Sequence, residues 1–190
     1  MKVIISIVLA FIVAFLAYML YANIKEPISF HAEKDVREGK VQDKLEEIRE
    51  AQKIFKDITG KYAHDFDTLV SVLKYDSIEF VKFSGDPDAG IEIVKTFSYS
   101  PAIDSIRALG INLDSLKYVP YSQTGSTFVM NADTITYQQT LVHVCEVSTR
   151  YKEFMGKYSD KKYGRFDNLY KPSNALKIGD MNKPTLNGNW

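Results

Sequence analysis

The chain has 190 residues, in which 24 Lys and Arg balance 24 Asp and Glu, and it holds a single cysteine. Hydrophobic residues at 45% and charged residues at 25% are ordinary for a folded protein and exclude a largely disordered chain. The single cysteine excludes an intrachain disulfide framework, and the length allows one folded domain plus an anchor.

Charge is unevenly distributed along the chain. Residues 61–149 hold 6 basic and 11 acidic side chains, whereas residues 150–190 hold 9 basic and 4 acidic ones. This asymmetry predicts that the basic tail folds back on the acidic middle of the chain. The alternative is that the tail meets an anionic partner.

The first element is an apolar segment from Val3 to Ala22 that has no charged residue. Twenty apolar residues are enough to span a bilayer as a helix, and Tyr18 and Tyr21 near one end suit the membrane interface. A cleaved signal peptide is the alternative, but its apolar core is normally shorter and Leu20 is too bulky for the cleavage site ending at Ala22. We expect an uncleaved anchor in residues 1–24.

The orientation of this anchor depends on its flanks. Only the amino terminus and Lys2 precede the span, and a short positive tail is an ordinary cytoplasmic flank. Lysines after the span, beginning with Lys25, argue the opposite way, but long domains translocate largely regardless of their own charges. We expect a single-pass protein of the inner (cytoplasmic) membrane with a periplasmic C-terminal domain.

Pro27 follows the span and predicts that the membrane helix ends or kinks there, because proline lacks a backbone donor and disfavours helix before it. We therefore expect residues 25–40 to form a juxtamembrane linker. The soluble domain is expected to cover residues 41–190.

An amphipathic helix is predicted at the start of the soluble domain. Apolar residues recur three or four positions apart, as one helical face requires. They are Val41, Leu45, Ile48, Ala51, Phe55 and Ile58. Gly60 suits the end of this helix, and Asp65 or Asp67 can cap a short second helix that begins near Phe66.

Period-two patterns after Tyr75 predict antiparallel strands. We expect hairpins from strands 78–83 and 91–99 and from strands 126–131 and 134–149, the second pair joined by Ala132 and Asp133. Further expectations are short helices near 102–109 and 154–169, an irregular strand around Pro120 and an extended segment at 176–180. The expected fold class is α+β: an N-terminal transmembrane helix, then an amphipathic spine helix and a short helix packed on an antiparallel β-sheet.

His143 and Cys145 are two residues apart in a predicted strand, so their side chains share a face. Such a pair could bind a metal or act as base and nucleophile. Their neighbours on that face are apolar, and a buried cysteine beside a hydrogen-bonded histidine explains them more simply.

Two acidic clusters have metal-compatible side chains. His64, Asp65 and Asp67 lie in a turn, where helix capping accounts for the aspartates. Asp86 and Asp88 lie in a glycine-rich loop that lacks the spaced oxygen ligands of a calcium site. We therefore assign no metal-ligating residue.

Lys161, Lys162 and Arg165 alternate with aromatic residues, a pattern that could bind a nucleic acid strand. A solvated face or a protein contact is the preferred interpretation. No phosphate-binding glycine motif and no hydrolase or metalloprotease motif is present. We accordingly predict no catalytic residue, no cofactor, no small-molecule substrate and no nucleic acid partner.

The front of the chain resembles type IV pilin-like proteins, including the pseudopilins of type II secretion. The resemblance covers about the first 75 residues: an apolar N-terminal helix, the amphipathic IREAQKIFKDITGKYA and then DFDTLV. It implies a helix that leans on an antiparallel sheet. The whole chain, including INLDSLKYVPYS and LKIGDMNKPTLNGNW, is also similar to single-pass membrane proteins of the Bacteroidetes, which implies a lineage and no activity.

These observations favour a membrane-anchored, non-enzymatic structural or interaction protein of a cell-envelope assembly. Its expected partners are the lipid bilayer, through Val3 to Ala22, and other envelope proteins or further copies of itself. One alternative is a pseudopilin-like subunit of a secretion or pilus system. The other is a membrane-tethered enzyme or metal-binding module that uses His143 and Cys145 or the turn at His64.

Overall fold

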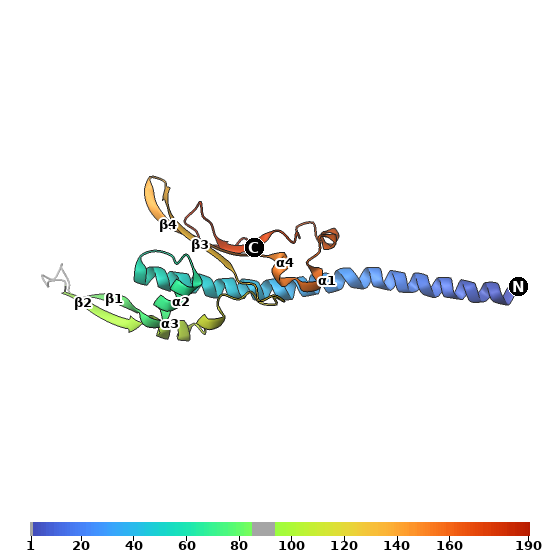
Figure 1. The fold of residues 1–190 in the computed structure, drawn as a ribbon, viewed down its shortest axis with the longest axis horizontal. Coiled ribbons are helices and arrows are strands. Elements are labelled where there is room, and N and C mark those ends of the chain that lie inside the picture. Colours follow the sequence, from blue (N-terminus) through green and yellow to red (C-terminus); the bar gives the residue numbers. More distant parts are fainter. Residues whose placement is uncertain (1, 85–93) are drawn as a thin grey trace.

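The computed structural model describes residues 2–84 and 94–190, and the fold is α+β, as expected (Figure 1). The helices are α1 (Lys2–Thr59), α2 (Phe66–Tyr75), α3 (Ala102–Ala108) and α4 (Tyr151–Phe154), and the strands are β1 (Ser77–Ser84), β2 (Val94–Pro101), β3 (Val129–Tyr137), β4 (Thr140–Arg150) and β5 (Ala175–Gly179). Short 3₁₀ turns lie at Leu113–Ser115, Gly156–Tyr158 and Lys161–Arg165.

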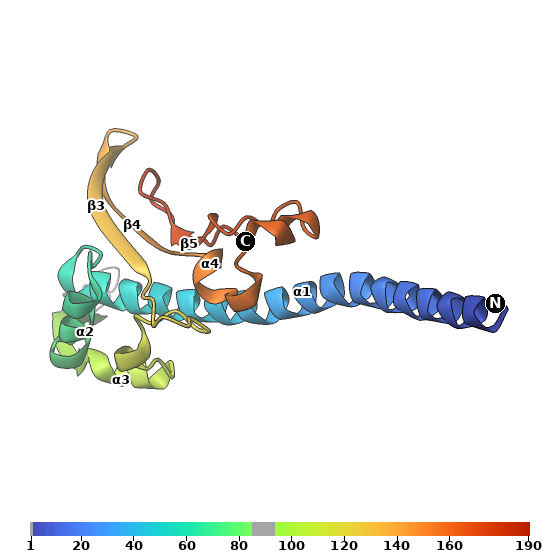
Figure 2. The same ribbon diagram turned by 45° about the vertical axis from the view of Figure 1, so that its right-hand side comes forward.

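Helix α1 runs through Pro27 without ending, so the expected linker at residues 25–40 is helical instead. The prediction of a helix end was wrong, and Figure 2 shows only a gentle bend in this helix. A proline removes one hydrogen bond from a helix, a loss that neighbouring contacts can offset. Those contacts begin at Phe30, which is fully buried against the C-terminal part of the chain.

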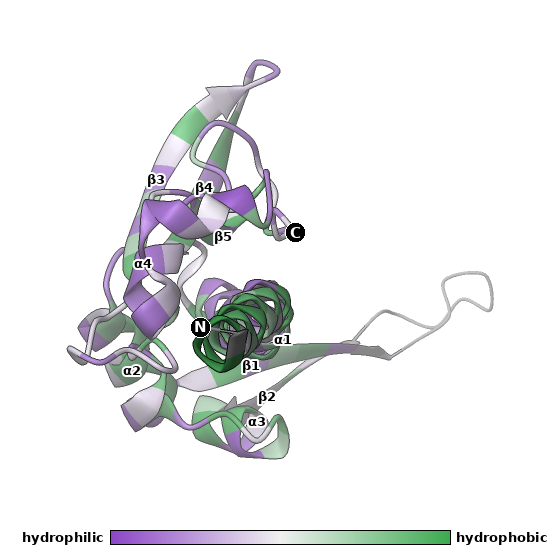
Figure 3. Ribbon diagram, turned by 90° about the vertical axis from the view of Figure 1, so that its right-hand side faces the viewer, coloured by the Kyte–Doolittle hydropathy of each residue, from purple (hydrophilic) through white to green (hydrophobic). Residues whose placement is uncertain are grey.

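The distal half of α1 is the axis of the folded part. Figure 3 views this helix end on, with α2, α3 and β1 on one side and β3, β4 and β5 on the other. The predicted stripe is confirmed: Val41, Leu45, Ile48 and Ala51 are fully buried, Phe55 is 2% exposed and Ile58 is half-buried. Burial of this stripe, rather than helix propensity, stabilises the helix in the domain.

The turn after α1 is also as predicted. Gly60 adopts a φ of 78°, and its backbone N–H donates to the carbonyl oxygen of Lys56 at 2.7 Å. A positive φ favours glycine because it has no Cβ. Of the two predicted capping residues, Asp65 caps α2 by accepting from the backbone N–H of Thr68 at 2.6 Å.

The strands form two separate antiparallel sheets instead of the one that we expected. The first is the pair β1–β2, and the second has the order β3-β4-β5. In the first sheet Ser77 pairs with Pro101, which places the base of the hairpin beside the start of α3. Ile91, Ile93, Asp86 and Asp88, assigned above to the second strand and its loop, lie outside the described residues.

The β3–β4 hairpin turns at a different place from the one we predicted. Ala132 and Asp133 lie within β3, opposite Cys145 and Val144, and the turn is formed by Gln138 and Gln139. These two residues have φ of 48° and 66°, as a two-residue type I′ turn requires. The turn was missed because such turns normally contain asparagine or glycine, and neither glutamine gives that signal.

Some of the remaining predicted elements are present in the structure and others are not. The helix at Ala102–Ala108 and the extended segment Ala175–Gly179 are confirmed. Near Pro120 the expected strand is reduced to an isolated bridge between Tyr118 and Thr127. The single helix expected over residues 154–169 is wrong, since one helical turn and two 3₁₀ turns occupy this region. Gly156, with a φ of 55°, interrupts the helical conformation there.

The C-terminal 3₁₀ turns are held by an aromatic collar, defined here as Phe30, Tyr158, Tyr163, Phe166 and Tyr170. The rings of Phe30 and Tyr163 stack at 5.7 Å with an interplanar angle of 4°. Tyr158 and Tyr170 meet Phe30 edge on at 5.5 Å and 5.1 Å. Residues 158–170 are thereby packed around α1 close to the point where it leaves the domain.

Candidate functional site

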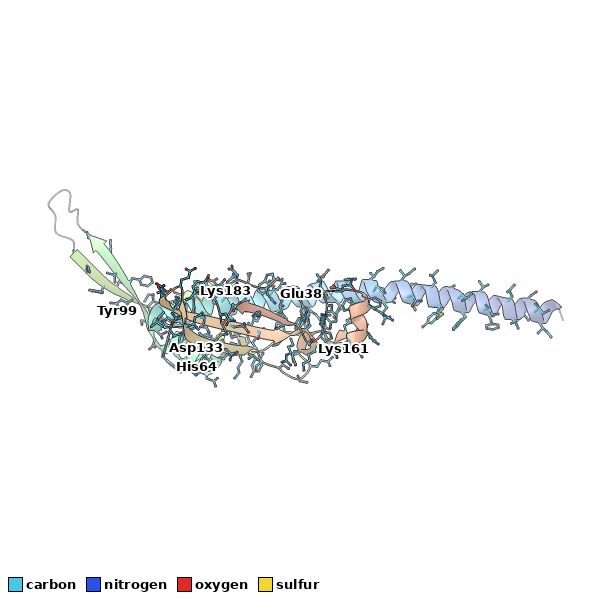
Figure 4. The ribbon with its side chains drawn as sticks, turned by 90° about the horizontal axis from the view of Figure 1, so that it is seen from above. Glu38, His64, Tyr99, Asp133, Lys161 and Lys183 are labelled. Atoms are coloured by element: carbon cyan, nitrogen blue, oxygen red, sulfur yellow. The ribbon has the colours of Figure 1, made fainter. Side chains whose placement is uncertain are left out.

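The β1–β2 hairpin carries several exposed apolar side chains on one projecting element. It projects beyond the end of α1 that lies away from the apolar segment (Figures 1 and 4). The exposed fractions of Phe80, Phe97 and Tyr99 are 51%, 55% and 67%. Phe97 lies opposite Val81 in the ladder, and Tyr99 lies opposite Glu79.

Few contacts of its own chain support this hairpin. Ile78, near its base, packs against the core, and the Tyr99 hydroxyl donates to Glu79 Oε1 at 3.3 Å. Within the described residues no third strand pairs with β1 or β2. Two-stranded hairpins are at best marginally stable alone, and exposed aromatic side chains gathered on one element mark interaction sites. The hairpin is therefore the candidate binding surface of this protein.

A second candidate is a hollow between the turn after α1 and the β3–β4 hairpin. It has a volume of about 220 Å³ and is lined by Lys61, Tyr62, His64, Ala132, Asp133, Thr134 and His143. Strand pairing places His143 opposite Thr134, and Gln52 holds the adjacent turn through hydrogen bonds of 2.9 Å to the backbone N–H and carbonyl of Ala63. His64 and Asp133 lie close together in Figure 4. We refer to this feature as the histidine hollow.

The two histidines and the aspartate of the histidine hollow already have local partners. His64 Nε2 lies 2.9 Å from Asp65 Oδ2, and His143 Nδ1 lies 2.8 Å from the Thr134 hydroxyl. Asp133 accepts from the backbone N–H of Thr134 at 2.7 Å. In residues 2–84 and 94–190 no three His, Cys, Asp or Glu side chains are grouped closely enough to hold a metal ion. The two histidines are brought together, but without further ligands.

Cys145 lies apart from this hollow although it shares a face of β4 with His143. Its side chain is 1% exposed, and burial raises the pKa of the thiol to about 12. A thiol that stays protonated at neutral pH is a poor nucleophile and a poor metal ligand. The arrangement favours a buried core cysteine.

Of the two aspartates in the His64 turn, Asp65 has a structural role as the cap of α2. Hydrogen bonding from the Thr68 backbone N–H lowers the pKa of the Asp65 carboxyl, as expected for a helix cap. Asp67 is almost fully exposed and forms only a long 3.9 Å ion pair with Lys117.

The basic segment at Lys161–Arg165 forms a 3₁₀ turn at the opposite end of the domain from the β1–β2 hairpin. Figure 4 shows Lys161 where the bare helix leaves the folded part and Tyr99 at the far end. Arg165 Nη2 lies 2.9 Å from Glu26 Oε2, and the Lys162 ammonium lies 4.8 Å from the Tyr163 ring centroid. The tail thus folds back onto α1 through Arg165 and, as predicted, onto the acidic middle of the chain through Lys177, whose ammonium lies 2.6 Å from Glu146 Oε2.

Sequence reasoning missed the residues that hold together the end of the domain from which the apolar part of α1 emerges. Phe30 and Arg37 both lie within the expected linker, and Arg37 donates to the Phe154 carbonyl oxygen at 2.6 Å. Continuing the Val41 stripe backwards by four, seven and eleven residues reaches Arg37, Lys34 and Phe30. That helical spacing was the available signal, and Pro27 obscured it.

Comparison with protein-family models, with curated proteins and with solved structures finds no match to this chain. Among the described residues, one helix is long and apolar enough to cross a membrane. This helix is the N-terminal α1, and its apolar stretch is not buried by the rest of the chain.

Proposed function

We propose that this protein is a membrane-anchored, non-enzymatic interaction protein of a cell-envelope assembly. Its anchor is the segment Val3 to Ala22, and its folded domain lies in the periplasm. The β1–β2 hairpin, held at the end of the domain away from the anchor, is the surface that contacts another envelope protein or a further copy of the chain.

The exposed aromatic residues of the hairpin carry this proposal. Phe97 and Tyr99 are more than half exposed on an element that projects from the core. A free hairpin also leaves unpaired backbone groups along its outer edges, which favour pairing with another strand. A partner would cover the aromatic face and complete the sheet.

Site-specific crosslinking tests the proposal directly. A photoreactive phenylalanine analogue at position 97 or 99 is expected to give a covalent adduct in intact cells, and mass spectrometry identifies the adduct as another protein or a second copy. Leu141, which is 72% exposed beside the turn of the β3–β4 hairpin, is the matched control. Absence of any adduct at 97 and 99 in correctly inserted protein overturns the proposal.

The periplasmic location needs its own experiment. Cys145 is buried, so it does not report on the compartment in the folded protein. A cysteine introduced at the exposed Asn168 gives the required reporter. Labelling by an impermeant maleimide in cells whose inner membrane is intact supports a periplasmic domain, and labelling only after that membrane is lysed contradicts it.

A pseudopilin-like subunit is a second candidate, favoured by the continuity of α1. An apolar helix that continues directly into an amphipathic spine is the arrangement that the resemblance to pilin-like proteins implies. The intact mass of the protein from membranes tests this candidate. Loss of a short leader with methylation of the new terminus supports it, whereas retention of Met1 and the apolar segment opposes it.

A further inference from the structure

Basic side chains gather where α1 leaves the folded part. Lys25 lies just after the apolar segment, and Lys161, Lys162 and Arg165 come from the 3₁₀ turn near the other end of the chain. All four are exposed, and Figure 4 shows Lys161 at the end of the domain from which the bare helix emerges. We call these four residues the basic patch.

The ion pair between Arg165 and Glu26 fixes the height of this surface above the bilayer. Glu26 is four residues beyond Ala22, and four residues of α-helix rise about 6 Å. The headgroup layer on each side of a hydrocarbon core is about 5–8 Å thick. With the apolar segment in the hydrocarbon core, the basic patch therefore lies at the depth of the lipid headgroups.

The basic patch belongs to the packed structure and is not a flexible tail. Tyr163, next to Lys162, is buried and stacks on Phe30 of α1. Asp160 caps the turn by accepting from the backbone N–H of Lys162 at 2.8 Å. Lys161 and Lys162 are thus carried by a turn fixed to the membrane helix, so little further conformational entropy is lost when their backbone meets a surface.

The positive charge of the basic patch is only partly compensated within the chain. Glu26 pairs with Arg165. Among residues 2–84 and 94–190, neither Lys161 nor Lys162 forms an ion pair with an acidic side chain, and Lys25 lies 5.4 Å from the ring centroid of Tyr21. A surface that keeps a net positive charge at headgroup depth is complementary to anionic lipid.

We propose that the basic patch docks the domain onto the anionic phosphate headgroups of the leaflet from which α1 emerges. This proposal rests on the membrane anchoring in the proposed function, but not on the hairpin or its partner. Docking holds the long axis of the domain at a defined angle to the bilayer. It thereby presents the β1–β2 hairpin at a defined distance from the membrane.

The test uses the full chain in nanodiscs of phosphatidylcholine, alone or mixed with phosphatidylglycerol. A fluorophore on Ser159→Cys, beside the basic turn, is quenched by a lipid that carries a spin label on its headgroup. The variant is Lys161→Gln with Lys162→Gln. The control is Lys61→Gln with Lys183→Gln, which removes the same charge from two exposed positions. Figure 4 shows Lys183, and His64 three residues after Lys61, away from the end where the bare helix leaves the folded part.

Quenching is expected to rise with phosphatidylglycerol and to fall with added salt. Each lysine near an anionic surface contributes a factor of about 5 to binding, so the double variant should lower the ratio of docked to undocked domain by about 30-fold. The control should resemble the wild type. Equal quenching in both lipids for the wild type, or equal loss in both double variants, overturns the docking while leaving the hairpin crosslinks intact. A chain that does not insert at all overturns both proposals.

Discussion

Aromatic residues gather at both ends of the folded part, and the two groups are used in opposite ways. In the aromatic collar, Phe30 is fully buried and contacts the four other rings of the collar. In the β1–β2 hairpin, Phe97 and Tyr99 are more than half exposed. The same type of side chain therefore closes the structure at one end and leaves it open at the other.

This contrast indicates where the protein is complete and where a partner is needed. The collar packs the C-terminal turns against α1, so the end of the domain from which the apolar part of α1 emerges is held by contacts within the chain. Of the hairpin residues that the structure describes, Ile78 alone packs against the core cluster. We expect substitutions in the collar to lower stability and substitutions in the hairpin to lower binding.

The largest expected effect is that of Phe30→Ala. It removes a fully buried ring and leaves a cavity among the collar residues, which costs about 3–5 kcal/mol of unfolding free energy. Trp190, the only tryptophan, lines a hollow together with Lys34, Glu38 and Tyr170, so its fluorescence reports on this end of the domain. Denaturant titration of the full chain in detergent measures the change.

Ile28→Ala is the control for this substitution, because Ile28 lies on the same helix and is 65% exposed. Its expected effect in detergent is within about 0.5 kcal/mol. Similar losses for Phe30→Ala and Ile28→Ala would contradict the assignment of the collar as the fastening of the C-terminal segment.

A smaller loss is expected for Gln52→Ala, which tests how the distal half of α1 is held. Gln52 is fully buried and satisfies both backbone polar groups of Ala63 at 2.9 Å. Leaving those groups unpaired costs about 2–4 kcal/mol. Gln42, whose amide makes a long 3.4 Å contact with Glu38, is the control and should lose little when changed to alanine. Equal losses for the two glutamines, measured by denaturant titration, would contradict the role of Gln52.

The next effect in size is that of Asp65→Ala, which removes the cap of α2 beside the hairpin. Loss of a capping carboxylate costs about 1 kcal/mol. Because the pKa of Asp65 is lowered in the folded state, its stabilisation is present above the unfolded pKa of about 4. It is lost as pH falls through the lower folded pKa. Asp65→Asn keeps an acceptor and should retain most of the stability without this pH dependence, which thermal unfolding at several pH values measures.

What the sequence could predict follows from how local each signal is. The stripe from Val41 to Phe55, the glycine stop at Gly60 and the Asp65 cap depend on neighbouring residues, and all three are confirmed. The continuity of α1 through Pro27 depends on Phe30 meeting residues more than a hundred positions later, which no local pattern reveals. Tertiary contact overrode the local preference of proline.

The sites divide in the same way. Burial of Cys145 could be anticipated from the apolar neighbours on its strand. The approach of His64 to His143 could not, because it depends on the turn at Gln138 and Gln139 setting the register of β3 against β4. The exposure of Phe97 could not be predicted either, because the alternation of apolar and polar residues predicts a strand but not whether a second layer covers it.

The smallest expected change in stability is that of Phe97→Ser in the hairpin, and it makes the contrast with the collar sharpest. The ring is 55% exposed and faces Val81 across the strands, so its removal should alter the unfolding free energy by no more than about 0.5 kcal/mol. The same change should abolish the adduct formed through a crosslinker at position 99, because the partner loses an aromatic anchor. A loss of stability comparable to that of Phe30→Ala would mean that the hairpin aromatics belong to the fold, and a partner would then have to be sought on another surface.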